Sequence, residues 1–263
     1  MRVTVIMPLY NHAAFVEQAL RSVLAQNTDA AIDILVVDDG STDDGASIVQ
    51  RLAETDPAIR LIRTSNQGVT RTRNVGLRNL PSDCDFVTFC DSDDVLSAGR
   101  LRSDLAEFAA DPDLEITFGK LLAVDRIDPD ALAPEADART AEIRIPQLGA
   151  AIFRKSLVER IGFFDETLVQ SEDTDYLLRA FESGAPYLIT DTVAVYYRQH
   201  GGNMSHDRDV ARRYLMFALR RSFDRRRRGS TSAVPAEIFP FVGAVEPAGG
   251  DRLAAKRRRV GGE

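Results

Sequence analysis

Short apolar runs alternate with longer amphipathic segments along the first 125 residues of the chain. Runs rich in β-branched and aromatic residues are typical of strands, and they occupy residues 3–7, 32–37, 59–63, 86–90 and 115–124. Between these runs the apolar residues recur at the spacing of one helical face, as at Val16, Leu20 and Val23. Strands alternating with helices predict an α/β fold whose mostly parallel central sheet is covered by helices on both faces.

The rest of the chain has a less regular pattern. Residues 126–146 are rich in Pro, Ala and Asp, which predicts a loop or linker. Further on, the pattern predicts a helix with an acidic first turn over residues 171–184 and a strand over residues 192–198. A helix can form over residues 210–224, and beyond it we expect little fixed structure. We therefore expect one domain in two halves and a tail, with boundaries at 1–125, 126–206 and 207–263.

Polar side chains follow three of the predicted strands at the point where each strand ends. Tyr10 and Asn11 follow the first strand, Asp39 follows the second, and Asp91 and Asp93 follow the fourth. Parallel strands bring their carboxyl ends to one edge of the sheet, which is where ligands bind in folds of this class. The sequence therefore predicts a binding site at that edge.

The three carboxylates of Asp91, Asp93 and Asp94 lie within four residues, where like charges repel and raise one another's pKa. A divalent cation such as Mg²⁺ or Mn²⁺ would relieve this repulsion and leave positions for phosphate oxygens. The spacing D-x-D occurs six times in the chain, so the position after a buried strand is what favours this pair. The plain alternative is an acidic surface loop, and we interpret Asp94 as a solvated or capping carboxylate.

Other α/β phosphate sites are excluded by missing motifs. The chain has neither G-x-G-x-x-G after the first strand nor the P-loop G-x-x-x-x-G-K-[ST]. The first strand ends in "PLYN" rather than in the carboxylate of aspartyl-phosphate enzymes. A metal, rather than a glycine-rich loop, is therefore expected to hold the phosphates.

Charge is unevenly distributed along the chain. Residues 1–206 hold 19 Lys and Arg against 33 Asp and Glu, whereas residues 207–263 hold 14 against 7. The acidic body argues against nucleic acid as a partner, and the basic tail suits peripheral contact with an anionic membrane or simply reflects an arginine-rich composition.

Two cysteines form no disulfide or zinc pattern, and no apolar run is long enough for a secretory signal or a membrane span. We expect a cytoplasmic protein that can contact the inner face of the membrane.

Seven stretches in order resemble the inverting family 2 glycosyltransferases, which have the nucleotide-sugar-binding fold called GT-A. They read "VIMPLYNHAAFVEQALRSVLAQ", "ILVVDDGSTDD", "NQGVTRTRNVGL", "FVTFCDSDD", "GAAIFRKSLVERIGFFDETL", "SEDTDYLLR" and "YYRQHGGNMS". The resemblance extends over roughly residues 1–205 and leaves out the tail. It implies a nucleotide-sugar-binding half (1–125) and an acceptor-binding half (126–206) of one catalytic domain.

The resemblance also implies the reaction. A sugar would move from a nucleotide-diphosphate donor, expected to be a UDP-sugar, to a hydroxyl of a sugar, lipid-linked or glycoconjugate acceptor. The anomeric carbon would be inverted, a divalent cation (Mn²⁺ or Mg²⁺) would assist, and the product would belong to a cell-envelope polysaccharide or a glycoconjugate. Two alternatives stay open, a nucleotidyltransferase and a nucleotide-sugar-binding module without activity. The first stretch lacks the glycine-rich basic loop of nucleotidyltransferases.

Site residues follow from the matched motifs. Donor binding is implied for Pro8, Tyr10, Asn11, Asp39, Gly68, Arg73, Asp91 and Ser92. Metal ligation is implied for Asp93, Asp91 and His200, although His200 can equally be an exposed loop histidine, and His12 has a weaker claim near the donor. Asp173 matches the general base and Glu172 its neighbour, while Arg73 is as readily explained as a surface arginine packed on the sheet.

Overall fold

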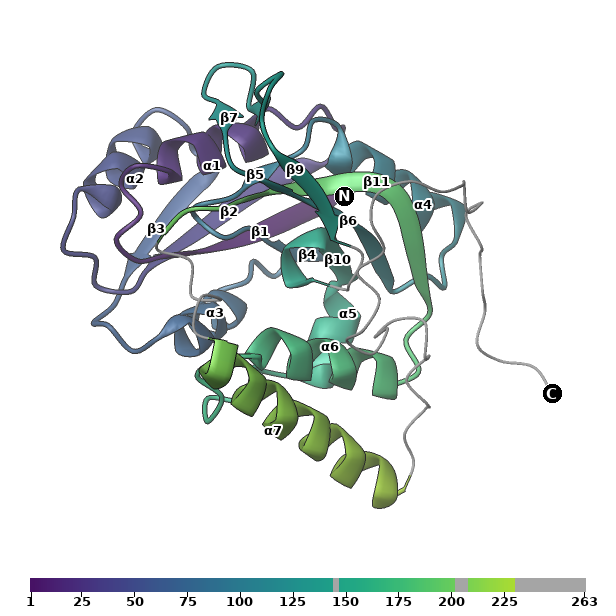
Figure 1. The fold of residues 1–263 in the computed structure, drawn as a ribbon. Helices are drawn as coiled ribbons and strands as arrows, with labels where there is room; N and C mark the ends of the chain where they lie inside the picture. Colours follow the sequence, from purple (N-terminus) through teal and green to yellow (C-terminus); the bar gives the residue numbers. More distant parts are fainter. Residues whose placement is uncertain (144–146, 202–207, 230–263) are drawn as a thin grey trace.

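The protein is an α/β sandwich built on one large sheet, and the computed structural model describes residues 1–143, 147–201 and 208–229 (Figure 1). The strands of this sheet lie in the order β3-β2-β1-β4-β10-β6-β11-β5, and β9 pairs with β6 outside that path. Their bounds are β1 Arg2–Leu9, β2 Ala31–Asp38, β3 Ile59–Arg63, β4 Phe86–Phe89, β5 Val95–Leu96, β6 Ile116–Val124, β9 Thr140–Ile143, β10 Ala151–Arg154 and β11 Tyr187–Arg198.

The first four predicted strands along the chain, β1 to β4, form a parallel unit. Strand β1 pairs in parallel with β2 and β4, and β2 pairs in parallel with β3. Beyond β4 the sheet is mixed, because β10 runs antiparallel to both β4 and β6, whereas β11 is parallel to β6. The α/β expectation is confirmed, and the parallel part of the sheet is the part that forms the strand-end edge.

Residues 126–146, expected as a loop or linker, contain short strands instead. Strands β7 (Ile127–Asp128) and β8 (Ala133–Pro134) form a small two-stranded sheet, and β9 adds to the edge of β6. Strand β9 has mostly exposed residues, so it lacks the apolar alternation from which a strand is recognised. The expectation of a plain linker is therefore wrong for these segments.

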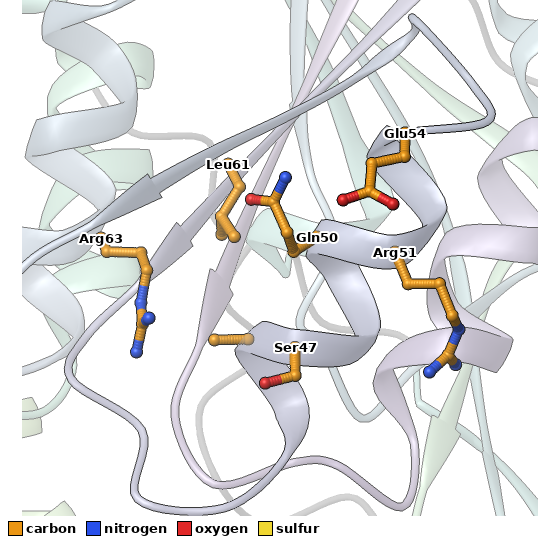
Figure 2. Close-up of a pocket in the computed structure, with 7 residues that line it drawn as sticks. Ser47, Gln50, Arg51, Glu54, Leu61 and Arg63 are labelled. Carbon is orange, nitrogen blue, oxygen red and sulfur yellow. The ribbon is translucent and has the colours of Figure 1, made fainter.

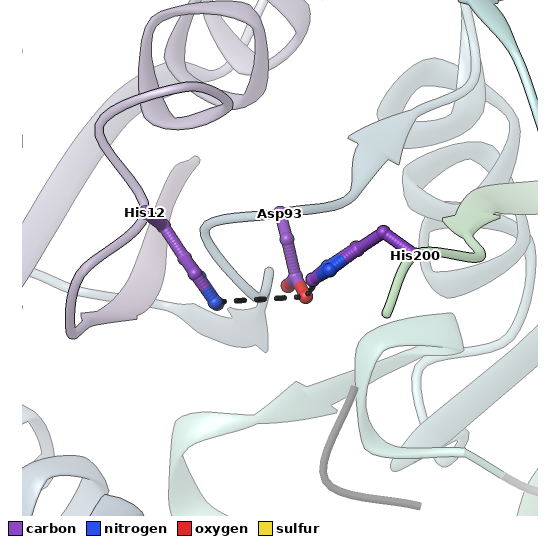
Figure 3. Close-up of side chains that lie close together, drawn as sticks. All are labelled: His12, Asp93 and His200. Carbon is purple, nitrogen blue, oxygen red and sulfur yellow. Dashed lines mark hydrogen bonds and ion pairs between the residues drawn. The ribbon is translucent and has the colours of Figure 1, made fainter. Parts of the chain in front are cut away.

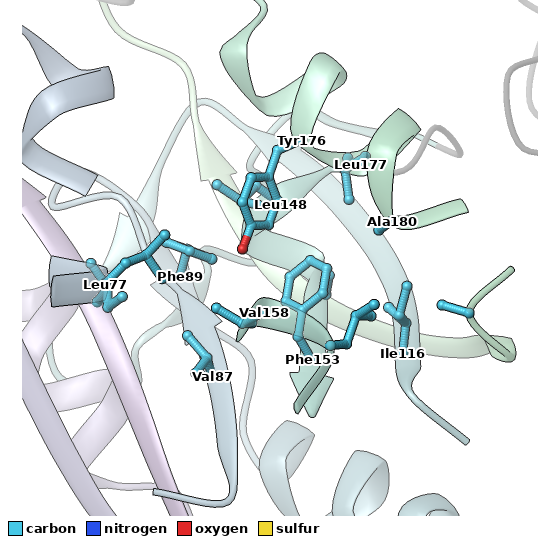
Figure 4. Close-up of a cluster of buried hydrophobic side chains, with 14 of the residues drawn as sticks. Leu77, Val87, Phe89, Ile116, Leu148, Phe153, Val158, Tyr176, Leu177 and Ala180 are labelled. Atoms are coloured by element: carbon cyan, nitrogen blue, oxygen red, sulfur yellow. The ribbon is translucent and has the colours of Figure 1, made fainter. Parts of the chain in front are cut away.

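Helices cover both faces of the sheet, as predicted. Their bounds are α1 Val16–Leu24, α2 Gly45–Ala53, α3 Val69–Arg78, α4 Arg100–Ala110, α5 Lys155–Ile161, α6 Glu172–Glu182 and α7 Arg208–Arg227. Alternate residues of β1 point to opposite faces, so that Val5 and Met7 pack with α1 while Ile6 packs toward α3. Figure 4 shows the core on the second face, where Phe153 and Tyr176 lie among side chains from β4, β6 and α6.

Helix α3 lies very close to β1. A Cβ on Gly76 would approach Ile6 Cγ2 to 2.5 Å, so only glycine permits this spacing. Asn74, which is fully buried, donates through Nδ2 to the Phe164 carbonyl at 3.0 Å and accepts from the Phe164 amide at 2.8 Å. These contacts hold the middle of α3 in place against the segment that leads to α6.

A buried ion pair fastens α4 to the middle of the sheet. Arg100 and Asp104 are fully buried, and Arg100 donates to the carbonyls of Gly149 at 2.7 Å and Ala151 at 2.9 Å. Arg100 Nε lies 3.4 Å from Asp104 Oδ2. Burial lowers the pKa of Arg100 and raises the pKa of Asp104 to about 6, while each partner's charge opposes the shift of the other.

The predicted tail begins with a helix that packs on α6. In Figure 1, α7 runs alongside α6 on the outer side of that layer. Arg225 donates to Asp175 at 2.8 Å and to Glu182 at 2.6 Å, so part of the "RRRR" run faces the body of the protein. Within the described residues no helix is both long and apolar enough to cross a bilayer. The segment expected to lack fixed structure falls mostly in residues 230–263, outside the described residues.

Candidate active site

The ends of β1, β2 and β4 meet at one edge, as the sequence predicts. Leu9 and Asp38 are paired in register, and the Asp39 amide donates to the Leu9 carbonyl at 2.8 Å. Asn11, whose φ is 53°, accepts from the Thr42 amide at 2.8 Å. Asn11 therefore links the loop after β1 to the loop after β2. This structural role accounts for Asn11 without a contact to the donor, so its predicted donor-binding role stays a prediction.

Tyr10 and Pro8 occupy different surroundings at this edge. Pro8 is buried within β1 beside Val37 of β2, whereas Tyr10 is 45% exposed at the start of the following loop. Tyr10 is thus the one of the two whose side chain reaches the surface. The donor-binding role of both residues stays a prediction.

Asp39 holds the loop that precedes α3. Its carboxylate accepts from the amides of Gln67 at 2.9 Å and Gly68 at 2.8 Å. Gly68 has φ 90°, and no atom lies within 4 Å of where a Cβ would be, so its backbone faces open space. A carboxylate has about four lone-pair sites, so Asp39 can accept a further hydrogen bond from a ligand.

Each carboxylate of the acidic loop after β4 has a different partner. Asp91 accepts from Arg73 at 2.8 Å, Asp93 lies 3.0 Å from His200 Nε2, and Asp94 accepts from the Arg198 amide at 2.9 Å. Asp94 is 5% exposed, so its interpretation as a solvated carboxylate is wrong. Burial, together with the charges of Asp93 and Asp91, raises the pKa of Asp94 well above its usual range.

Arg73 links this acidic loop to the start of α6. It is 7% exposed and bonds both Asp91 and Glu172, which excludes its interpretation as a surface arginine. Burial alone would lower the pKa of Arg73, but the carboxylates of Asp91, Glu172 and Asp173 raise it instead. Burial raises the pKa of Glu172 to about 7, against the opposing effect of Arg73.

Asp173 lies in the first turn of α6, next to Glu172. The preceding residue, Ser171, has φ 58°, and Asp173 Oδ1 accepts from the Thr174 amide at 2.6 Å. A carboxylate at a helix N-terminus is stabilised in its charged form by the helix dipole. Unlike Glu172, which is bonded to Arg73, Asp173 makes its side-chain hydrogen bonds only with Thr174 among those found in the described residues.

Three side chains converge where a cation can bind. His12, Asp93 and His200 each offer a ligand atom, and these three atoms all lie within 4.8 Å of one another (Figure 3). They come from the β1–α1 loop, the β4–β5 loop and the segment after β11. Nitrogen and carboxylate oxygen donors at this spacing fit a divalent transition-metal ion. Asp91, also expected as a ligand, is directed to Arg73, so its ligation stays a prediction.

From the sequence alone, His12 has only a weaker claim near the donor. His12 follows directly on "PLYN" at the sheet edge, and that position was the available signal. Ser92 is 2% exposed and lies 2.8 Å from His12 Nδ1, which gives it a positioning contact beside its predicted donor role. Arg198, which donates to the Asp93 carbonyl at 2.9 Å, was not anticipated because the pattern identified only a strand there.

A groove lies beside the end of β3. It is formed by α2 and β3 and is lined by side chains that include Gln50, Leu61 and Arg63 (Figure 2). None of the residues that the sequence predicts for the site lines it.

Comparison of the sequence with known proteins gives a family match and several relatives. The family model described as Glycosyl transferase family 2 matches residues 4–162. The "Uncharacterized glycosyltransferase EpsJ" of Bacillus subtilis is 27% identical over 77% of this chain and 62% of its own length. The poly(ribitol-phosphate) beta-N-acetylglucosaminyltransferase TarS of Staphylococcus aureus is 27% identical over 78% of this chain and 37% of its own. The chain thus spans less than two thirds of each of these relatives.

Solved structures share the fold. Staphylococcus aureus TarS 1–349 in complex with UDP-GlcNAc superposes with a TM-score of 0.63 at 21% identity, covering 83% of this chain and 65% of that one. The mannosyltransferase PcManGT from Pyrobaculum calidifontis, in complex with GDP-Man and Mn²⁺, gives 0.63 at 23% identity, covering 91% and 67%. At these identities the likeness establishes the GT-A fold and no more.

Proposed function

The chain belongs to glycosyl transferase family 2, and we propose that it transfers a sugar from a UDP-linked donor to an acceptor hydroxyl with inversion at the anomeric carbon. The observation that carries this proposal is the convergence of His12, Asp93 and His200 beside the loop that Asp39 holds. Family membership favours this reaction over a nucleotidyltransferase.

The donor is proposed to lie along the strand-end edge. Gly68, with open space at its Cα, allows the donor to approach the backbone closely, and Asp39 beside it accepts a hydrogen bond from the base. A UDP-sugar is favoured because TarS, which is similar over 78% of this chain, has been solved with UDP and with UDP-GlcNAc. PcManGT has been solved with GDP-Man, so the nucleotide base of the donor is tested by titration below.

Charge in the site suits the departure of a diphosphate. A bound Mn²⁺ or Mg²⁺ supplies positive charge beside the leaving group. Asp93 and His200 are proposed to hold that ion, and Arg73 keeps Asp91 in place as a candidate contact for the donor. Arg73 is buried between two carboxylates, so its charge is committed to them rather than free to meet a phosphate.

Asp173 is proposed as the general base that takes the proton from the acceptor hydroxyl. Its neighbour Glu172 is held by Arg73 in a buried ion pair, so its carboxylate is less free to meet an acceptor hydroxyl than that of Asp173. In this proposal Glu172 positions Arg73 and the start of α6, and Asp173 alone faces the acceptor.

The acceptor is proposed to be a hydroxyl of a cell-envelope polymer or glycoconjugate. The printed activity of TarS, on poly(ribitol-phosphate), supports this class of acceptor. Residues 126–206 are proposed as the acceptor-binding half, because they contribute Asp173 and His200 to a site whose other residues come from 1–125.

Calorimetric titration with UDP, GDP, TDP and CDP tests the donor class. We expect UDP to bind in the presence of Mn²⁺ and to bind at least about tenfold more weakly after chelation, because the diphosphate then lacks its counter-charge. A preference for GDP would keep the transferase proposal and replace the UDP assignment. Equal binding of all four nucleotides with and without Mn²⁺ would contradict it.

Helix α7 is proposed to touch the anionic inner face of the membrane. Its outer surface exposes Met216 at 60%, Phe217 at 48% and Phe223 at 54%, with the exposed arginines Arg212, Arg213, Arg220 and Arg227 among them. Arginine near anionic lipid contributes about 1 kcal/mol each, and apolar side chains add area buried in the headgroup region. Such contact would bring the enzyme to a lipid-linked acceptor on the cytoplasmic side.

Sedimentation with phosphatidylglycerol vesicles tests the membrane contact. We expect salt-sensitive binding that falls about tenfold in the double variant Met216→Ser/Phe223→Ser, since each substitution removes apolar area from the interface. Ile189→Ser is the matched control, because Ile189 is 44% exposed on β11 and lies outside α7. Vesicle binding unchanged in the double variant would remove α7 from the proposal.

A further inference from the structure

We propose that His12 is a third protein ligand of the divalent cation and that it makes the site prefer Mn²⁺ to Mg²⁺. This inference rests on the proposed function, because it concerns the cation that assists the diphosphate. The His12 Nε2 atom lies 3.9 Å from Asp93 Oδ2, and the His200 Nε2 atom lies 3.0 Å from the same oxygen. Ligands about 2.1 Å from one metal are about 3 to 4 Å apart, so the three atoms need only small movements to share an ion.

A hydrogen bond fixes the orientation of the His12 ring. Its Nδ1 atom lies 2.8 Å from the hydroxyl of Ser92, which is almost completely buried. With Nδ1 bonded to Ser92, the other ring nitrogen is directed at Asp93, as Figure 3 shows. Metal-binding histidines commonly have one nitrogen held in this way while the other ligates. Ser92 is therefore a positioning residue for His12.

The gap between His12 and Asp93 is too long for a direct hydrogen bond. A charged imidazole paired with a carboxylate would approach to about 2.8 Å, and the observed separation is 3.9 Å. The ring is held back by Ser92 on one side, so it does not close onto Asp93. A separation of 3.9 Å is within the range expected for two ligand atoms of one divalent ion.

Aromatic packing holds the histidines before any ion binds. The His200 ring lies against Phe15 with ring centroids 4.7 Å apart, and the His12 ring meets the edge of His200 at 5.9 Å. Arg198 lies over the Phe15 ring, 4.9 Å from its centroid, and donates to the Asp93 carbonyl at 2.9 Å. The ligands from three separate segments are therefore oriented by fixed neighbours.

The donor set determines which metal is preferred. Mg²⁺ favours oxygen ligands throughout. Imidazole nitrogen binds Mn²⁺ more readily than Mg²⁺, and binds the later transition metals more readily still. Two imidazoles and one carboxylate form the cluster, and Asp91, the other candidate carboxylate, is bonded to Arg73. A site of this composition binds Mn²⁺ in preference to Mg²⁺, and His12 supplies half of its nitrogen ligands.

Manganese binding tests the role of His12 directly. MnCl₂ is titrated into the full chain, and free Mn²⁺ is measured by its electron paramagnetic resonance signal, with MgCl₂ as competitor. We expect His12→Ala to bind Mn²⁺ about tenfold more weakly. We expect MgCl₂ to displace Mn²⁺ more readily from His12→Asp than from the unaltered chain. Ser92→Ala is expected to weaken Mn²⁺ binding less than His12→Ala, because it removes only the orienting hydrogen bond.

The outcomes separate this inference from the proposed function. If His12→Ala binds Mn²⁺ as tightly as the unaltered chain while His200→Ala does not, His12 is no ligand and the transferase proposal stands. If His12→Asp leaves the ratio of Mn²⁺ to Mg²⁺ affinity unchanged, the claim about preference is wrong. If the unaltered chain binds no Mn²⁺ with or without UDP, the metal-dependent function fails as well. Unchanged thermal unfolding of each variant in the absence of metal confirms that its fold is intact.

Discussion

Replacing Asp173 with asparagine is expected to lower the rate of UDP release from the donor about a thousandfold while leaving UDP affinity within about twofold. Asparagine keeps the size of the side chain and can still accept from the Thr174 amide, which Asp173 Oδ1 meets at 2.6 Å. It cannot take up the proton of the acceptor hydroxyl. The loss therefore falls on the chemical step and not on donor binding.

The measurement pairs steady-state UDP release with calorimetric binding of UDP and Mn²⁺. Asp113→Asn is the control, because it makes the same change of charge at an exposed position next to α4. Retained turnover in Asp173→Asn would show that another group is the base. Loss of both turnover and UDP binding would point to a structural role at the start of α6. A chain that binds UDP with no turnover even before substitution would be a binding module.

Replacing Arg100 with methionine is expected to reduce the free energy of unfolding by about 3 to 5 kcal/mol at neutral pH. The substitution leaves the Asp104 carboxylate buried without its partner and deprives the carbonyls of Gly149 and Ala151 of their donor. Burial already raises the pKa of Asp104 to about 6, and loss of the Arg100 charge raises it further. Because the folded state then holds a proton that the unfolded state releases, the destabilisation grows as the pH rises.

Urea unfolding followed by circular dichroism at pH 5 and pH 7.5 measures this effect. Arg102→Met is the matched control, since Arg102 is exposed on the same helix, and its substitution should change stability by less than about 0.5 kcal/mol. A loss below about 1 kcal/mol for Arg100→Met, or a larger loss at pH 5 than at pH 7.5, would contradict the proposed role of the pair.

The parallel half of the sheet could be predicted because its signals are local. Strands β1 to β4 are mostly apolar, and the helices α1 and α2 each have one apolar face. Given parallel strands, the gathering of Asn11, Asp39 and Asp93 at one edge follows from topology alone. Strand β10, with four residues, and β5, with two, are too short to show a period.

The partners within the site could not be predicted in the same way. His12 and Ser92 are 80 residues apart, and Asp93 and His200 are 107 residues apart, so no local pattern reports that they meet. Arg73 was open to several interpretations until its two carboxylate partners placed it in the interior. The division of the acidic loop among Arg73, His200 and Arg198 depends on side-chain directions that the spacing D-x-D does not determine.

The measurement that tests the central claim most directly is the affinity of the chain for UDP with and without Mn²⁺, compared between the unaltered protein and Asp93→Asn. We expect Mn²⁺ to strengthen UDP binding at least about tenfold in the unaltered chain and to have no effect in Asp93→Asn, because Asp93 is the carboxylate of the cluster with His12 and His200. Equal strengthening by Mn²⁺ in both proteins would place the cation elsewhere and contradict the assignment of this edge as the donor site.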